Sequence, residues 1–492
     1  MDPSFAIGGT DPWEANQERV DGQGHDLDDL SVGNRLSLEI EDIAAGGEGV
    51  GKHNGFVIFV PSSAPGDILE VELISVKKKY GRARISKIIE PSRRRKKPPC
   101  PVYEQCGGCQ FQHLDYDAQL AYKTKMVKDA LEHLGSLSGV EVKPCRGMKD
   151  PWYYRNKAQM MVAGRPYLER EDRPEGPRLR PYFGFYQRRT HRVVPVSECL
   201  IQSKENNSVL RAARDMAERL AWVPYNETTE TGFLRYVLAR TNVKGDILLV
   251  LVATQPSLPH VKEFVSGLRG RVKRLKGVLV NLNPHRTNVI LGSTTRLVWG
   301  QDHLMEDIGG LKFRISPASF FQVNPWGLKA IYNCLDEELK LRGRDTVLDL
   351  YCGVGSLALY MAKRVRRVVG IDNCAPAIED AVINSDVNDL SNTYFATGSA
   401  EKVLPRLYQQ GERFASVVVD PPRKGCAPEV LNTVARMRIP QMVYISCNPA
   451  TLARDLGQLA ELGYRTTMVQ PIDMFPQTYH VESVATLTRK RR

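Results

Sequence analysis

The chain has 492 residues, of which 42% are hydrophobic and 25% are charged, and its formal net charge is +12. It lacks an apolar run near the roughly 18 residues that a membrane span needs, and it lacks the basic and apolar regions of an export signal, so we expect a cytoplasmic protein with no membrane partner. At about 100–200 residues per domain the length predicts two to four domains, and the basic balance is compatible with a nucleic-acid partner.

The first part of the chain is predicted to be a tail followed by a small domain. Residues 1–31 are rich in Asp, Gly and Gln and lack periodicity, which predicts a disordered tail. From residue 32 to about residue 91, short alternating stretches are separated by Gly turns, as in GGEGVGK. This pattern predicts a small β-barrel. It ends in a basic segment and a Pro- and Arg-rich linker, PSRRRKKPP.

Residues 92–300 are predicted to form a central α+β domain, because a helical segment near 115–135 is followed by alternating stretches such as DILLVLVAT. A charged insertion at 164–181 is expected to be an exposed loop. The chain has ten cysteines and no export signal, so a disulfide framework is not expected. The cysteines are therefore candidates for metal ligands, catalytic thiols or core residues.

Residues 301–492 carry the clearest pattern, because short apolar runs alternate with helical segments in the order TVLDLYCGVGSL, RRVVGIDNC, SVVVDPP and QMVYISCNP. This order predicts an α/β fold with a doubly wound parallel sheet, similar to a Rossmann fold. The carboxyl edge of such a sheet is where ligands bind.

Two glycines and two acids are expected to converge on that edge. Gly353 and Gly355 follow the first strand and permit close approach of the backbone to a nucleotide-like ligand. Asp372 ends the second strand, where it can accept hydrogen bonds from ribose hydroxyls, and Asp420 ends the fourth. The glycine pattern is shorter than a dinucleotide fingerprint, which favours S-adenosylmethionine over NAD. The alternative is that the glycines only pack a turn.

A candidate nucleophile, Cys447, follows the fifth strand in the turn Ser-Cys-Asn-Pro. A free cysteine is commonly a small buried hydrophobe, but this one lies beside the predicted methyl donor. A thiolate that adds to C6 of uracil turns C5 into a carbon nucleophile able to attack an electrophilic methyl group. The scheme then needs a base for the C5 proton, and Glu482 near the end of the chain is the candidate.

These motifs resemble the RNA 5-methyluridine methyltransferase family, in particular its ribosomal-RNA branch with a TRAM domain and an iron–sulfur cluster. The resemblance covers essentially everything after the tail and appears as FFQVN, DLYCGVGS, DPPR, SCNP and HVE. It implies Cys447 as nucleophile and Glu482 as base. It implies donor contacts from Gln322, Tyr351, Ser356, Asp372, Ser399 and Asp420. Ser399 departs from the family pattern, which commonly has Asn or Asp there, so the adenine contact is expected to be indirect or to fall to the backbone of Ala400.

The resemblance also implies two further elements. The barrel resembles a TRAM domain, an OB-like RNA-binding barrel, and its basic residues are then phosphate contacts: Lys77, Lys78, Lys79, Arg82 and Arg84. The cluster motif supplies the ligands of a [4Fe–4S] cluster: Cys100, Cys106, Cys109 and Cys199. Zinc is the alternative metal, because four thiolates also suit it. Cys145 lies outside the motif and is expected to be structural.

The resulting prediction is a monomeric enzyme that methylates C5 of a specific uridine in 23S ribosomal RNA, in a structured loop with a single-stranded target. A tRNA uracil-5-methyltransferase acting on the T loop is the nearer alternative. Transfer to cytosine C5 also uses a thiolate, but that class places its cysteines differently. A non-catalytic RNA-binding or assembly factor would require the motifs to be relics.

Overall fold

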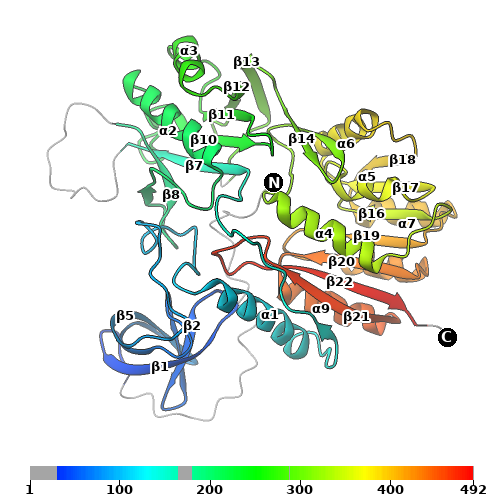
Figure 1. The fold of residues 1–492 in the computed structure, drawn as a ribbon, viewed down its shortest axis with the longest axis horizontal. Helices are drawn as coiled ribbons and strands as arrows, with labels where there is room; N and C mark the ends of the chain where they lie inside the picture. Colours follow the sequence, from blue (N-terminus) through cyan, green and yellow to red (C-terminus); the bar gives the residue numbers. More distant parts are fainter. Residues whose placement is uncertain (1–29, 165–179, 287–288, 491–492) are drawn as a thin grey trace.

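The computed structural model describes residues 30–164, 180–286 and 289–490, and Figure 1 shows three regions arranged around a common centre. The tail and the charged insertion predicted at 1–31 and 164–181 fall almost entirely outside the described residues. Among the helices that are described, none is both long and apolar enough to span a bilayer.

The predicted N-terminal barrel is confirmed. Five strands close in the order β1-β2-β3-β5-β4. They are β1 (Arg35–Ile43), β2 (Gly49–His53), β3 (Phe56–Val60), β4 (Ile68–Val76) and β5 (Tyr80–Glu90). Alternate residues such as Leu38 and Ile40 point inward and form an apolar core with Ile58 and Val71.

The central region is a seven-stranded sheet in the order β13-β12-β11-β10-β7-β8-β9. Its strands are β7 (Lys157–Ala163), β8 (Tyr182–Tyr186), β9 (Val193–Pro195), β10 (Leu234–Thr241), β11 (Ile247–Ala253), β12 (Leu275–Leu282) and β13 (Thr294–Gly300). Two helices, α2 (Lys204–Arg219) and α3 (Val261–Arg271), bury one face of the sheet around Trp222 and Phe264. A hairpin of β14 (Leu304–Ile308) and β15 (Leu311–Ile315) leads into the C-terminal region.

The C-terminal region is an eight-stranded sheet in the order β18-β17-β16-β19-β20-β22-β21-β6. Its strands after residue 301 are β16 (Thr346–Leu350), β17 (Arg367–Asp372), β18 (Thr393–Thr397), β19 (Ser416–Val419), β20 (Gln441–Ser446), β21 (Tyr464–Ile472) and β22 (Glu482–Arg489). The first five pair in parallel and wind outward in both directions from β16, which confirms the predicted doubly wound sheet. β22 is antiparallel to β20.

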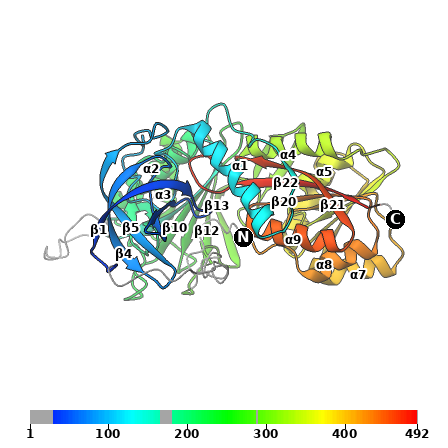
Figure 2. The same cartoon turned by 90° about the horizontal axis from the view of Figure 1, so that it is seen from below.

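Helices cover both faces of this sheet. They are α4 (Pro325–Glu338), α5 (Ser356–Ala362), α6 (Ala375–Val387), α7 (Ala400–Gln409), α8 (Pro428–Arg436) and α9 (Pro449–Glu461). Figure 2 shows α4 and α5 on one side and α7, α8 and α9 on the other. Leu328 and Leu357 belong to the core of the first face, whereas Leu404, Val430 and Leu452 belong to the core of the second.

One part of the range predicted as the central domain belongs structurally to the C-terminal sheet. The helix α1 (Tyr116–His133) lies beside α9, and its residues Val127 and Leu131 enter the core of that face. The following short strand β6 (Glu141–Val142) adds to the sheet edge in parallel with β21. The chain therefore visits the C-terminal layer before it builds the central sheet.

Candidate active site

A cavity of about 910 Å³ lies at the carboxyl ends of β16, β17, β19 and β20, and loops of the central region form its opposite wall. Its size is within the roughly 300–1,000 Å³ of small-molecule sites. Nine predicted residues line it: Gln322, Tyr351, Gly353, Ser356, Asp372, Ser399, Asp420, Cys447 and Glu482. Residues from seven segments of the C-terminal region therefore meet in one cavity, as expected for the carboxyl edge of an open α/β sheet.

The turn after β16 is shaped for close approach of a ligand. Tyr351 and Gly353 have positive φ angles of 66° and 53°. The Gly353 backbone N–H donates to Oδ2 of Asp372 at 2.9 Å, and the Cys374 N–H donates to Oδ1 at 2.8 Å. These two bonds hold the Asp372 carboxylate at the mouth of the turn. They fix the orientation of a side chain that is expected to accept ribose hydroxyls.

Gly355 is absent from the cavity lining among the described residues, although the sequence placed it with the cofactor contacts. Its φ angle is 82°, and a Cβ atom there would lie 3.2 Å from Cζ of Phe395. The glycine is therefore needed for the left-handed turn before α5 and for packing. Its effect on a cofactor is through the shape of the turn.

Cys447 lies where β20 ends and α9 begins. Oγ of Ser446 accepts the Asn448 N–H at 3.1 Å, and the Asn448 side chain then caps α9 by accepting the Ala450 N–H at 3.1 Å. The intervening thiol is half-buried and lines the cavity. Burial raises the pKa of the Cys447 thiol to about 12; the neighbouring Glu482 carboxyl adds to the rise and the Arg423 guanidinium opposes it.

Glu482 faces the same point from the neighbouring strand. Ser446 pairs with Ser483 across β20 and β22, so Cys447 and Glu482 are adjacent at the two strand ends. Glu482 is 4% exposed, and burial together with nearby Asp420 raises the pKa of its carboxyl well above the usual value. Burial and nearby Asp372 raise the pKa of Asp420 to about 7. The crevice therefore contains a thiol beside carboxyl groups that hold protons strongly.

Comparison with known proteins agrees with this geometry. The tRNA (uracil-5-)-methyltransferase family model matches residues 288–490, and the TRAM domain model matches residues 30–86. A protein of Halalkalibacterium halodurans named as an RNA methyltransferase is 44% identical over 456 residues, covering 92% of this chain and 97% of that protein. The chain belongs to the RNA uracil-5-methyltransferase family. A protein of Bacillus cereus named as an RNA methyltransferase is 42% identical, and the match covers 92% of this chain and 96% of that protein.

A solved structure resembles this RNA methyltransferase over most of its length. The Pyrococcus abyssi tRNA (uracil-54, C5)-methyltransferase, crystallised with S-adenosyl-L-homocysteine, aligns with a TM-score of 0.73 and 28% identity. The alignment covers 92% of this chain and 100% of that one. The predicted fold and the use of S-adenosylmethionine are thereby confirmed.

The four cysteines of the predicted cluster motif gather around a second, smaller cavity of this methyltransferase. Cys100, Cys106, Cys109 and Cys199 all line it. The Gly108 N–H lies 3.4 Å from Sγ of Cys106, and burial raises the pKa of the Cys106 thiol to about 12. In the part of the chain that the structure describes, no three of these sulfurs lie within 4.8 Å of one another.

Two kinds of metal group take four cysteine ligands. Tetrahedral zinc holds each sulfur at about 2.3 Å, which places the sulfurs roughly 4 Å from one another. A four-iron cluster holds each thiolate on a different iron and therefore needs a wider ligand set. The four cysteines around one cavity supply the number of thiolate donors that either group takes.

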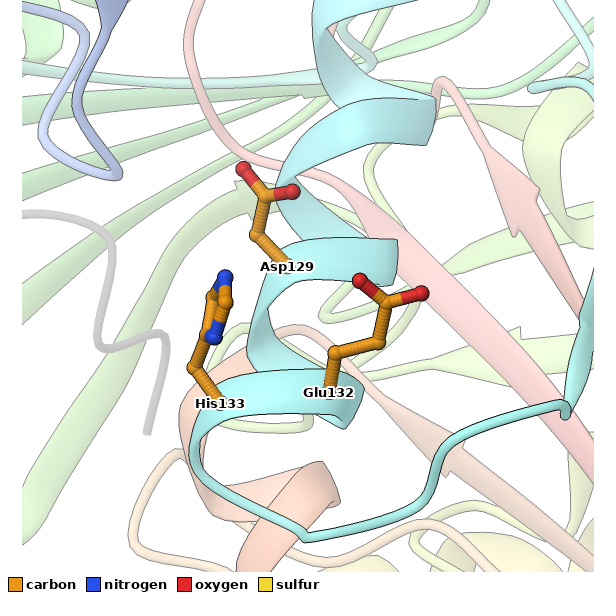
Figure 3. A group of neighbouring side chains, drawn as sticks. All are labelled: Asp129, Glu132 and His133. Carbon is orange, nitrogen blue, oxygen red and sulfur yellow. The ribbon is translucent and has the colours of Figure 1, made fainter.

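Another group of possible ligands lies on the surface of α1. Asp129, Glu132 and His133 place their ligand atoms within 4.8 Å of one another at the end of that helix (Figure 3). Asp129 already pairs with Lys125 at 2.6 Å, and Glu132 and His133 are exposed. This is an ordinary charged helix surface, and we assign it no metal.

Sequence reasoning missed several residues of the site. Arg423 belongs to the DPPR motif and donates from Nη2 to Nδ1 of His480 at 3.1 Å. Phe320 lines the cavity and is 38% exposed, which suits an aromatic ring that stacks on a base. Both residues lie in motifs that the sequence showed, Phe320 in FFQVN and Arg423 in DPPR. Arg155 and Arg188 come from the central region, and only the packing of the domains brings them to the cavity.

The barrel cations divide into two groups. Arg84 donates to both carboxylate oxygens of Glu72, at 2.9 and 3.0 Å, and Arg82 lies 3.7 Å from the buried Glu48. The consecutive lysines at 77–79 are exposed on the turn between β4 and β5. Arg82 and Arg84 therefore already have carboxylate partners, and the three exposed lysines remain the candidates for the predicted phosphate contacts.

Proposed function

We propose that this RNA uracil-5-methyltransferase modifies a uridine of 23S ribosomal RNA through a covalent adduct on Cys447, with Glu482 as the base. The observation that carries the roles is the position of Cys447 and Glu482 at neighbouring strand ends, inside the cavity that also holds the predicted cofactor residues. S-adenosylmethionine supplies an electrophilic methyl group when bound. The remaining chemistry belongs to the side chains of the chain.

In the proposed reaction the Cys447 thiolate forms a bond from Sγ to C6 of the uracil, and the electron pair of the C5–C6 double bond moves toward O4. C5 of this enolate attacks the methyl carbon, and the bond from that carbon to the sulfonium sulfur breaks, with its electron pair leaving on the sulfur. Glu482 then removes the C5 proton, the electron pair re-forms the C5–C6 double bond, and the Sγ–C6 bond breaks to release the thiolate. Glu482 passes the C5 proton to the released thiolate, and the proton that the thiol lost before its attack goes to solvent, so thiol and base return to their starting states.

The electrostatics of the cavity support this division of roles. A carboxyl whose pKa is raised by burial is a stronger base once ionised than a solvated one, which suits Glu482 for a carbon-bound proton. The Cys447 thiol is neutral in the resting cavity because burial raises its pKa to about 12. Arg423 is the cation that opposes this rise, so it stabilises the thiolate that attacks.

We also propose that Cys100, Cys106, Cys109 and Cys199 hold a [4Fe–4S] cluster. Support comes from their common cavity and from the resemblance of their order in the sequence to the cluster motif of the family. The cluster would lie outside the methyl-transfer cavity. Its role in this proposal is to fix the loop at 107–110, which forms one wall of the methyl-transfer cavity.

Ribosomal RNA is favoured by the combination of a TRAM barrel with the four cysteines, which resembles the ribosomal branch of the family. Transfer RNA is the second candidate, because the Pyrococcus abyssi enzyme that aligns over 92% of this chain acts on tRNA. In either RNA the target uracil must leave its stack before the Cys447 thiol can reach its C6. Unstacking costs least in a single-stranded loop.

The test uses anaerobically purified full-length protein with labelled S-adenosylmethionine and either unmodified ribosomal RNA or unmodified tRNA. We expect 5-methyluridine in 23S RNA only, and no label with C447A. The matched control is C145A, because the Cys145 thiol lines neither described cavity. Label in tRNA alone would replace the ribosomal substrate, and label in cytidine would overturn the uracil mechanism.

A further inference from the structure

A buried arginine separates the cluster cavity from the methyl-transfer cavity. Arg155 precedes β7 and is 6% exposed. Across the described ranges its guanidinium forms no ion pair with a carboxylate, and its buried Nε atom has no hydrogen-bond partner. The side-chain contact that the structure gives it is the ring of Phe475, whose centroid lies 6.0 Å from Cζ.

Such a group is costly unless a charge compensates it. An arginine stays protonated inside a protein, so it cannot lose its charge as a buried lysine can. A buried charge without a partner strongly destabilises the fold. The absence of a protein carboxylate near Arg155 therefore points to an anion that the chain binds.

The position of Arg155 identifies two anions. It lines the cavity of the four cysteines and also the methyl-transfer cavity, and it shares this double position with Gly108. Its backbone is tied to the segment after Cys199, because its N–H donates to Ile201 O at 2.9 Å and its own carbonyl accepts the Ser203 N–H at 2.9 Å. The backbone of Arg155 is thus held against the segment that carries the fourth thiol.

We propose that Arg155 is the counter-ion of the cysteine-bound cluster and the electrostatic link between that cluster and RNA in the methyl-transfer cavity. The inference rests on the cluster and RNA substrate proposed above. Four thiolates around an iron–sulfur core carry a net negative charge, and the RNA backbone supplies the second anion. One cation between the two makes cluster charge and RNA affinity mutually dependent.

The other arginines of the cavity wall differ in this respect. Arg188 and Arg189 line the methyl-transfer cavity but are absent from the lining described for the cluster cavity. They lie 3.7 and 3.5 Å from Glu48, which Arg82 also contacts, so they share a protein carboxylate that Arg155 does not have. Arg188 is therefore a matched control, since it faces RNA from the same cavity without facing the cluster.

The experiment measures two properties of anaerobically purified full-length R155M, R155K and R188Q. The first is the reduction potential of the cluster at an electrode, in samples normalised for iron and sulfide. The second is the dissociation constant for unmodified ribosomal RNA in the presence of S-adenosylhomocysteine. Circular dichroism and iron content identify any variant that fails to fold. If R155M fails to fold, R155K still tests the proposal.

We expect R155M to shift the equilibrium for cluster reduction at least tenfold against the reduced form, which is 59 mV toward negative potential for one electron. The removal of a nearby cation makes it less favourable to add an electron to an anionic cluster. R155M should also weaken RNA binding at least fivefold, while R155K retains most of both properties. R188Q should weaken RNA binding and leave the potential unchanged.

An R155M potential equal to that of the unaltered protein, at full iron content, would overturn the proposal. So would equal shifts of the potential in R155M and R188Q. If the unaltered protein transfers methyl groups but contains no iron and sulfide, the counter-ion role fails while the methyltransferase function stands. If the potential shifts as expected but no uridine is methylated, the counter-ion role stands and the proposed reaction fails.

Discussion

The Arg423 guanidinium lies 3.1 Å from Nδ1 of His480, and this contact joins the loop after β19 to the loop that leads to the base. The backbone oxygen of Arg423 also accepts the Nδ2–H of Asn448, at 3.2 Å, directly after Cys447. Arg423 is therefore attached to both sides of the site. It is also the cation that opposes the rise of the Cys447 pKa.

Loss of the Arg423 cation should raise the pKa of the Cys447 thiol. We predict that R423A lowers the rates of Cys447 alkylation and of methyl transfer about tenfold for each unit of that rise. Because the Cys447 pKa is already about 12, both thiols stay mainly protonated between about pH 7 and 9 and the ratio of rates should not change with pH. Peptide mapping after iodoacetamide measures Cys447 alone. R423K should recover most of the loss, and an unchanged alkylation rate in R423A would contradict the role.

The second prediction concerns Glu482. In E482Q the thiolate can add and the methyl group can transfer, but the C5 proton is not removed, so the Sγ–C6 bond persists. We expect a protein–RNA adduct that survives denaturing electrophoresis, and turnover about 10²–10⁴-fold below normal. C447A should form no adduct. Equal amounts of adduct in E482Q and unaltered protein would show that Glu482 is not the base.

The C-terminal fold was predictable because its signals are local. Runs such as TVLDL and SVVVD are apolar, rich in β-branched residues and bounded by Gly or Pro, so they indicate buried parallel strands. Cys447 and Asp420 follow such runs directly, and their place at the carboxyl edge therefore follows from the pattern. The placement of Gln322 and Ser399 rested instead on the family resemblance.

Other features depend on contacts between distant segments. The two-residue strand β6 has no periodicity, and only its pairing with β21 shows that the chain enters the C-terminal sheet before residue 150. The adjacency of Cys447 and Glu482 requires the register of β20 with β22, which no local pattern specifies. Arg155 stands in the sequence YYRNKAQ, and its burial between two cavities results from domain packing.

A third prediction follows from Asp420, whose pKa is raised by burial to about 7. In the unfolded chain the pKa of this carboxyl is about 4, so its folded-state pKa is raised. The stability that it contributes is fully present below about pH 4 and is lost as the pH rises through about 7. D420N does not titrate. Its melting temperature relative to the unaltered protein should therefore increase between pH 5 and pH 8, measured without cofactor.

The same substitution should weaken S-adenosylmethionine binding, because Asp420 lines the cavity at the predicted cofactor end. The combination of higher stability at pH 8 and lower affinity would show that a functional carboxylate is kept in an unfavourable environment. A difference in melting temperature that is the same at pH 5 and pH 8 would show that Asp420 titrates normally.

The last prediction concerns the ion pair that anchors the loop before Glu482. Lys123 of α1 and Asp473 after β21 are both fully buried, and Nζ lies 2.5 Å from Oδ1. Lys123 also donates to the backbone oxygen of Phe475 at 3.2 Å, and Tyr116 donates to Oδ2 of Asp473 at 2.9 Å. K123M leaves this buried carboxylate without its cation, so we expect the free energy of unfolding to fall by about 3–5 kcal/mol.

The matched control is K125M. Lys125 lies two residues further along the same helix, on its exposed side, and forms exposed pairs with Asp42 and Asp129. An exposed pair contributes roughly 0–1 kcal/mol, so K125M should unfold at nearly the same urea concentration as the unaltered protein. The double variant K123M/D473N removes both charges and should recover part of the loss, because no unpaired carboxylate remains. Since Asp473 begins the loop that leads to Glu482, K123M should also lower methyl transfer more than K125M does. Equal stability of K123M and K125M would mean that the pair does not anchor the loop, and the position of Glu482 would then depend on its strand alone.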